Sequence, residues 1–141
     1  SRVCRSLAAL SRADPAVPSV SLSLCERLGD SLAQLGHFQR AAEFYQKQLS
    51  LAESLELPGR DLAVIHVSLA TTYRDLGQHS RALEHFQREL ELRKGEPLEE
   101  CRTWLNVALA LEDLGSDPSQ LLPPLQSALS CARNAGDPRL K

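Results

Sequence analysis

Residues 28–51 read LGDSLAQLGHFQRAAEFYQKQLSL, and residues 69–92 repeat the pattern as LATTYRDLGQHSRALEHFQRELEL. The positions that recur identically 41 residues later are Leu28, Leu35, Gly36, Arg40, Ala41, Glu43, Gln46, Leu49 and Leu51. A fixed period of this length indicates stacked supersecondary units, none of which can bury its apolar face alone. Because such arrays present extended concave surfaces, the repeat favours partner binding over catalysis.

The composition is that of one ordinary domain. The chain has 141 residues, of which 43% are hydrophobic and 24% charged, and these values are typical of globular proteins. The 16 basic and 18 acidic residues are closely interspersed, whereas a general nucleic-acid binder needs a basic face to displace counterions. No apolar run approaches the ~20 residues that span a bilayer. Because the chain starts at Ser1, without an initiator Met or a clear signal peptide, we expect a piece of a longer protein.

The cysteines do not form a metal-binding or disulfide pattern. Cys4, Cys25, Cys101 and Cys131 are widely spaced, with neither a CxxC pair nor a Cys–His spacing suited to zinc. Cys25 falls at an apolar repeat position, and two others lie on expected helices. We therefore predict buried, reduced thiols for most of them, as in an intracellular protein.

Apolar residues follow helical spacing almost throughout, and no stretch alternates as a strand does. Gly36, Gly77 and Gly115 each end a helix, where glycine supplies the positive φ of a tight turn. Pro97 stands at a favourable first-turn position. Pro123 and Pro124 predict a last helix that begins late, around Pro123, or is kinked. The predicted units are 1–14 (end helix of a preceding repeat), 19–58, 60–95 and 97–136.

The matching positions of each unit resemble the tetratricopeptide-repeat family. A small residue follows Leu or Val in the first helix (Gly29, Ala70, Ala108). Ala41 and Ala82 are the corresponding small residues of the second helix. The fold class is therefore predicted to be all-α, a right-handed solenoid of antiparallel helix pairs with a long period of about 40 residues, against the usual ~34. Gln48 and Glu89 replace the final alanine of the pattern, which predicts looser or more polar packing there.

Longer phrases are similar to one particular family. RAAEFYQKQLSLAE (40–53), VIHVSLATT (64–72), LEECRTWLNVAL (98–109) and SALSCA (127–132) resemble the Tonsoku-like proteins of vertebrates, from about Leu24 to Leu140. The resemblance implies a nuclear scaffold that acts in repair and recombination at stalled replication forks. It implies protein partners: a large obligate repair partner, histone chaperones or replication proteins. The family's histone-reading ankyrin repeats are not matched here, so only the fold and a protein-binding role are carried over.

First helices line the groove of such a solenoid, and the repeat register assigns its residues. Arg102 and Asn106 lie four apart on one helical face, where Asn can pair with a peptide backbone and Arg can bind a carboxylate. Apolar Val67, Leu105 and Leu109 on a nominally open face indicate a partner-binding surface. The alternative at each polar position is a solvated helix face. The predicted groove is Arg27, Asp30, Val67, Ser68, Thr71, Arg74, Arg102, Leu105, Asn106 and Leu109.

Acidic residues narrow the choice of ligand. Glu26 and Asp30 stand where chaperone-tail clamps of this repeat family use Lys and Asn, so a peptide's terminal carboxylate would be repelled. The sequence has no HExxH, no GxSxG and no glycine-rich phosphate loop, and His66 falls on a core stripe as a packed aromatic. We therefore expect no enzyme, cofactor, metal site, small-molecule substrate or direct nucleic-acid binding. The alternatives to groove binding are a structural spacer and a self-associating module.

Overall fold

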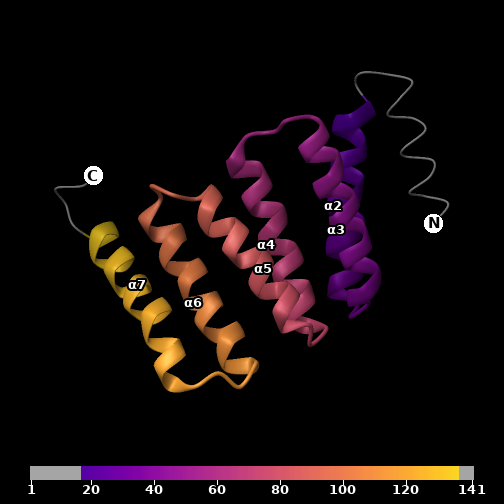
Figure 1. Cartoon of the computed structure of the whole chain (residues 1–141). Helices are drawn as coiled ribbons and strands as arrows, with labels where there is room; N and C mark the ends of the chain where they lie inside the picture. The colour runs from indigo at the N-terminus through magenta and orange to yellow at the C-terminus, as the bar shows by residue number, and fades with distance from the viewer. Residues whose placement is uncertain (1–16, 137–141) are drawn as a thin grey trace.

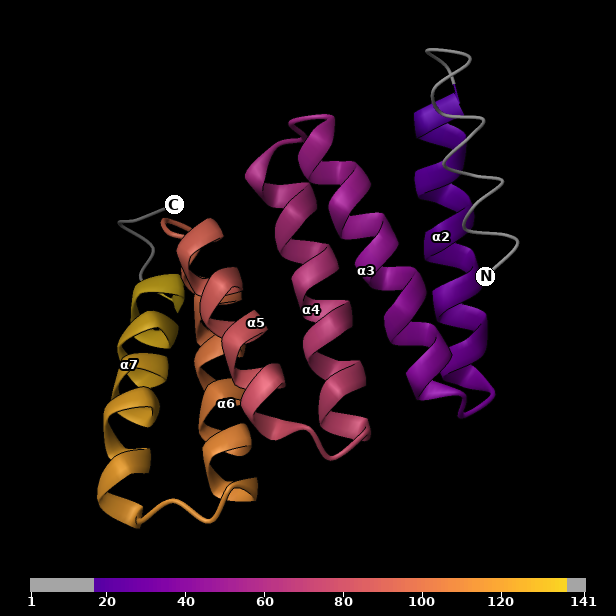
Figure 2. The same ribbon diagram turned by 45° about the vertical axis from the view of Figure 1, so that its right-hand side comes forward.

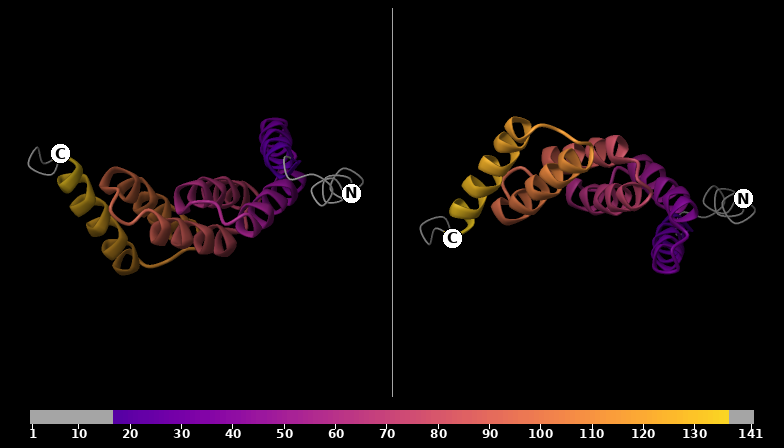
Figure 3. Two further views of the ribbon diagram at one scale, coloured as in Figure 1. Left: turned by 90° about the horizontal axis from the view of Figure 1, so that it is seen from above. Right: turned by 90° about the horizontal axis from the view of Figure 1, so that it is seen from below.

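The computed structural model describes residues 17–136, and these form six α-helices, labelled here as in Figure 1. Each helix packs mainly against the helices before and after it, so α2 and α7 lie at opposite ends of one row (Figures 1 and 2). Seen from above and below, the row is curved (Figure 3). The all-α solenoid of helix pairs is thus confirmed. The helices are α2 (Val17–Gln34), α3 (Phe38–Ser54), α4 (Gly59–Asp75), α5 (His79–Leu92), α6 (Pro97–Asp113) and α7 (Pro118–Gly136).

The turn within each pair is closed in the same way. Gly36 has a φ of 83° and its N–H donates to the Ala33 carbonyl at 3.0 Å, while His37 N–H donates to the Leu32 carbonyl at 2.8 Å. This pair of bonds is the Schellman motif, which satisfies carbonyls at the helix end. The same bonds recur at Gly77 and Gly115, whose φ values are 78° and 80°. The predicted role of these three glycines is confirmed.

The small residues in the repeat allow close approach of paired helices. Ala41 and Ala82 are fully buried. A Cβ added to Gly29 would lie 2.6 Å from Tyr45 Cε1, so the Tyr45 ring of α3 packs directly on the α2 backbone. The shared core joins these positions and Leu49 of α3 to the apolar stripes of α4, α5 and α6, chiefly Ile65, Leu69, Tyr73, Phe86 and Val107.

The last helix corrects one prediction. Helix α7 begins at Pro118 and continues through Pro123 and Pro124, so the expected late start is wrong. Gln120 explains the early start, because its Oε1 accepts the Asp117 backbone N–H at 3.1 Å, as in a capping box. The two internal prolines leave the carbonyls of Ser119 and Gln120 without helical donors, but both residues are exposed and water can hydrate them.

The thiols are less buried than predicted. Cys25 is buried, but Cys101 and Cys131 are half-buried free thiols. Cys131 lies at the seam of α6 and α7, where its Sγ donates to Glu100 Oε2 at 3.6 Å, and burial is the main cause that raises its thiol pKa. Cys4 and the predicted helix at 1–14 lie outside the described residues. Across 17–136, none of the helices is both long and apolar enough to cross a membrane.

Candidate partner-binding groove

The first helices of the three pairs, α2, α4 and α6, border two hollows in the described part of the chain. The N-terminal hollow, of about 300 Å³, is lined by Leu22, Glu26, Gln48, Leu57, Asp61, Val64 and Ile65. The C-terminal hollow, of about 270 Å³, is lined by Val64, Val67, Ser68, Glu89, Arg93, Glu99, Arg102, Thr103 and Asn106. Because Val64 lines both, they are neighbouring parts of one groove along the array.

Four of the predicted groove residues meet in the C-terminal hollow. Val67 and Ser68 come from α4, and Arg102 and Asn106 come from α6. The Arg102 guanidinium lies 3.4 Å from Glu99 Oε1, yet 65% of its side chain remains exposed. Arg102 can therefore still bind an anionic or carbonyl group of a partner, beside the Asn106 amide.

The other predicted residues lie outside the two hollows. Leu105 and Leu109 are exposed on α6. Arg74 pairs with Asp113 at 3.8 Å, and the Thr71 hydroxyl donates to the Val67 carbonyl of its own helix.

Near the N-terminal end of the array, Arg27 is exposed, whereas Asp30 is hydrogen-bonded within the protein. The Tyr45 hydroxyl donates to Asp30 Oδ1 at 2.5 Å. Desolvation of Tyr45 and this bond to Asp30 both raise the pKa of the Tyr45 phenol well above its usual range. Asp30 therefore joins α2 to α3, while the assignment of Arg27 stays a prediction.

Glu89 is one of the residues of the C-terminal hollow that the groove prediction left out. It is only 3% exposed, and its carboxylate accepts the Thr103 hydroxyl at 2.7 Å and the Arg93 Nε–H at 3.2 Å. Burial raises the pKa of Glu89, and the bonds from Thr103 and Arg93 oppose that rise. The signal in the sequence was that Glu89 replaces the final alanine of the repeat pattern, which predicted looser or more polar packing, and the packing is polar.

Arg93 connects this buried carboxylate to the rim of the hollow. Its Nη1 lies 3.5 Å from Glu96 Oε2 and 3.9 Å from Glu99 Oε2. With only 11% of its side chain exposed, Arg93 neutralises acidic groups from α5, α6 and the connection between them. The charges of the C-terminal hollow are thus largely paired within the protein.

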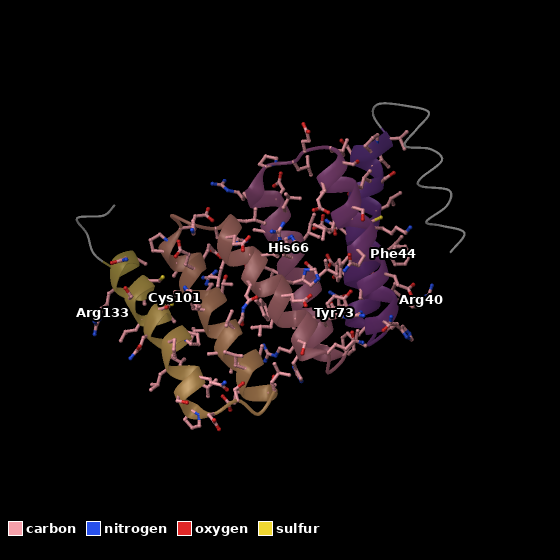
Figure 4. The ribbon with its side chains drawn as sticks, viewed as in Figure 1. Arg40, Phe44, His66, Tyr73, Cys101 and Arg133 are labelled. Carbon is pink, nitrogen blue, oxygen red and sulfur yellow. The ribbon has the colours of Figure 1, made fainter. Side chains whose placement is uncertain are left out.

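His66 is packed in the core between α4 and α5, at the middle of the array (Figure 4). It is 5% exposed, and its Nδ1 lies 2.9 Å from His85 Nδ1. Desolvation, with smaller contributions from His85 and Arg88, lowers the pKa of His66 to about 4. The His85 ring also stacks on Tyr73 at a centroid distance of 5.6 Å. His66 is therefore the packed aromatic side chain that its position on the core stripe predicted.

Comparison with known proteins agrees with this architecture. The family model described as tetratricopeptide repeat matches residues 20–95, more than half of the chain. The Tonsoku-like protein of Bos taurus is 47% identical over 132 residues, which is 94% of this chain and 10% of that protein. The Tonsoku-like protein of Danio rerio is 52% identical over 116 residues, 82% of this chain and 8% of the relative.

The Mus musculus Tonsoku-like protein is similar to the same degree, at 50% identity over 115 residues. The chain spans about a tenth or less of the length of these relatives. Repeated helix pairs, identical glycine-closed turns and the family match all describe one kind of array. This chain belongs to the tetratricopeptide-repeat family and is similar to the Tonsoku-like proteins over most of its length.

Proposed function

We propose that the chain is a protein-interaction module of a nuclear scaffold that acts in repair and recombination at stalled replication forks. The tetratricopeptide repeats and the similarity to Tonsoku-like proteins support the protein-interaction role. The nuclear location and the fork-repair role are inferred from the family resemblance. The same resemblance supplies the partner classes: a large obligate repair partner, histone chaperones or replication proteins.

One observation carries the proposal, namely the groove along α2, α4 and α6. Two adjoining hollows share Val64, and each combines apolar walls with polar groups near its floor. Pockets of this composition bind through apolar contact and are made specific by a few polar groups. A partner segment in extended conformation would reach both hollows in succession, and Arg102 and Asn106 would contact it in the second.

The test is affinity capture from nuclear extract of cells under replication stress, with quantitative mass spectrometry of the proteins recovered. The groove variant is Arg102→Glu with Asn106→Ala. A matched control, Arg40→Glu with Gln39→Ala, makes the same charge reversal and removes a side-chain amide at exposed positions of α3 that line neither hollow. Circular dichroism checks that both variants remain helical.

We expect wild type and control to recover the same replication or chromatin-repair proteins, and the groove variant to lose them. Equal recovery by all three would contradict groove binding and would favour the structural spacer. Recovery of proteins unrelated to replication, lost with the groove variant, would keep the groove and overturn the fork-repair role.

Self-association is a second candidate that one observation favours. Helix α7 exposes Leu122, Leu125 and Leu129, and a row of exposed leucines can bind another apolar face. Measurement of molecular mass at increasing concentration tests this candidate. A mass that stays monomeric, or that rises equally when these leucines are replaced by glutamine, would exclude association through this face.

A further inference from the structure

We infer that the N-terminal hollow binds a lysine or arginine side chain of the partner segment. This inference rests on the proposed groove-binding function and adds the chemical class of the bound residue. It depends on the walls of the hollow, the charges at its rim and one buried amide at its floor.

The walls of the hollow suit a long aliphatic stem. Leu22 of α2, Leu57 of the α3–α4 connection and Ile65 of α4 line it. Its volume of about 300 Å³ is at the lower end for ligand pockets. It therefore accepts a single long side chain rather than a helix or a folded partner. The methylene groups of lysine and arginine bury well against such surfaces while their charged ends stay near water.

The rim of the hollow is acidic, and no basic side chain lines it. Glu26 comes from α2 and Asp61 from the first turn of α4, so the two acids stand on opposite walls. Neither forms an ion pair within residues 17–136. A negative charge also favours the first turn of a helix, which is a structural reason for Asp61, but that reason does not apply to Glu26 in the interior of α2. A cationic group between the walls would donate charge-assisted hydrogen bonds to both carboxylates.

The floor supplies the second, independent observation. Gln48 of α3 is only 8% exposed, lines the hollow, and has no side-chain partner among the described residues. The amide group of Gln48 is not sealed from water, so it opens into the hollow and is available to a ligand there. The amide oxygen of Gln48 can accept a hydrogen bond from an ammonium or guanidinium group, and its NH₂ group can donate to a peptide carbonyl.

The C-terminal hollow is not suited to binding a basic side chain. Glu89 and Glu99 are already paired with Arg93, and Glu99 is also paired with Arg102 at the same rim. A basic side chain entering there would meet two cations. The charge pattern of the groove therefore directs a basic residue specifically to the N-terminal hollow.

The experiment uses a random dodecamer peptide library displayed on phage and panned against the whole 141-residue chain. The test variant is Glu26→Lys with Asp61→Lys. The matched control, Glu43→Lys with Glu53→Lys, makes the same charge change at exposed α3 positions that line neither hollow. We expect wild type and control to enrich peptides with a fixed Lys or Arg position, and the test variant to lose that preference.

A selected peptide, synthesised with a fluorescent label, then gives the affinity by anisotropy. Replacing its anchor lysine by norleucine keeps the stem and removes the charge. We expect this to weaken binding to wild type about tenfold, in the range of coupling between close charges. The same replacement should weaken binding by less than about twofold in a Glu26→Gln, Asp61→Asn variant, because the charge partners are then absent.

The outcomes distinguish a failure of this inference alone from a failure of the proposed groove-binding function. Suppose that the selected peptides bind wild type and no longer bind the Arg102→Glu, Asn106→Ala variant. If the norleucine replacement then weakens binding to wild type and to the Glu26→Gln, Asp61→Asn variant equally, the basic-residue inference is overturned and groove binding stands. Enriched peptides without a basic position lead to the same conclusion. If wild type enriches no peptide, both the groove-binding function and this inference fail.

Discussion

Gln48 and Glu89 occupy the same position in successive repeats, 41 residues apart, and both are buried at the floor of a hollow. Glu89 accepts hydrogen bonds from Thr103 and Arg93, whereas Gln48 has no side-chain partner in the described chain. The two hollows therefore have the same architecture but differ in what they can still bind.

Thr103 and Arg93 donate hydrogen bonds to Glu89. The residues at the same positions one repeat earlier cannot donate a side-chain hydrogen bond to Gln48. Thr103 corresponds to Ile65, 38 residues earlier, and Arg93 corresponds to Ala52, 41 residues earlier. An isoleucine and an alanine have no side-chain hydrogen-bond donor. The comparison teaches that the neighbouring repeat decides whether a buried polar side chain is satisfied within the protein or left open to the hollow.

The same contrast holds at the rims. Asp61 corresponds to Glu99, 38 residues later, but Glu99 lies within 3.9 Å of Arg93 and 3.4 Å of Arg102, and Arg102 stands where the earlier repeat has Val64. The C-terminal hollow thus carries its own counter-charges and the N-terminal hollow does not. Three experiments would break or sharpen the comparison of the two repeats.

The largest effect is expected at Arg93. Arg93→Ala removes the cation that compensates the buried Glu89 carboxylate, and an uncompensated buried charge destabilises by about 3–4 kcal/mol. Urea unfolding at neutral pH, followed by circular dichroism, measures this loss.

The matched control for Arg93→Ala is the double variant with Glu89→Ala, which restores the alanine of the repeat pattern. The double variant should regain a large part of the lost stability, since no buried charge then remains. If single and double variants are equally destabilised, Arg93 acts through packing and not through its charge.

The next largest effect is the pH dependence of stability caused by the buried histidine pair, which the preceding repeat lacks. His66 and His85 correspond to Cys25 and Phe44, 41 residues earlier, and neither of those side-chain types gains a charge in acid. The pKa of His66 is lowered from 6.5 to about 4, and desolvation also lowers that of His85, with Glu84 opposing and Arg88 assisting. Below pH 6.5 the unfolded chain therefore binds more protons than the folded chain, and stability falls as the pH falls towards 4.

His66 alone should lower the free energy of unfolding by about 2–3 kcal/mol between pH 6.5 and 4. Exchanging the pair for that of the preceding repeat, His66→Cys with His85→Phe, should remove this part of the pH dependence. Any loss of packing in the variant lowers stability equally at every pH and does not change the slope. Urea titrations at several pH values compare the two slopes. Parallel pH profiles for wild type and variant would show that the histidine pair does not cause the acid sensitivity.

The smallest effect is expected at Gln48. Gln48→Glu copies the residue of the second repeat without its Thr and Arg partners, beside the acidic Glu26 and Asp61. We expect a loss of about 1–2 kcal/mol at neutral pH, limited because the hollow is open to water. Thermal unfolding should show the loss shrinking in acid, as the new carboxyl becomes protonated. A variant as stable as wild type would show that the surroundings of Gln48 already accommodate a charge.

Much of the fold followed from local patterns that need no knowledge of distant contacts. The 3.6-residue apolar spacing placed the helices, and Gly36, Gly77 and Gly115 marked turns where a positive φ is required. The predicted late start of the last helix was wrong because the Asp117–Gln120 cap starts the helix before the two prolines. The repeat boundaries and the groove residues remain predictions, although Val67, Ser68, Arg102 and Asn106 meet in one hollow.

The periodic sequence was sufficient to establish the helix pairs, their stacking and the family, because period and register are properties of neighbouring residues along the chain. Only the tertiary structure shows that Glu89 has protein partners and that Gln48 has none among the described residues, or that Asp61 lacks the arginine available to Glu99. The reason is physical. Hydrogen bonds and charge pairs depend on distances between side chains from different helices, and a repeat of identical spacing can carry different partners at each step.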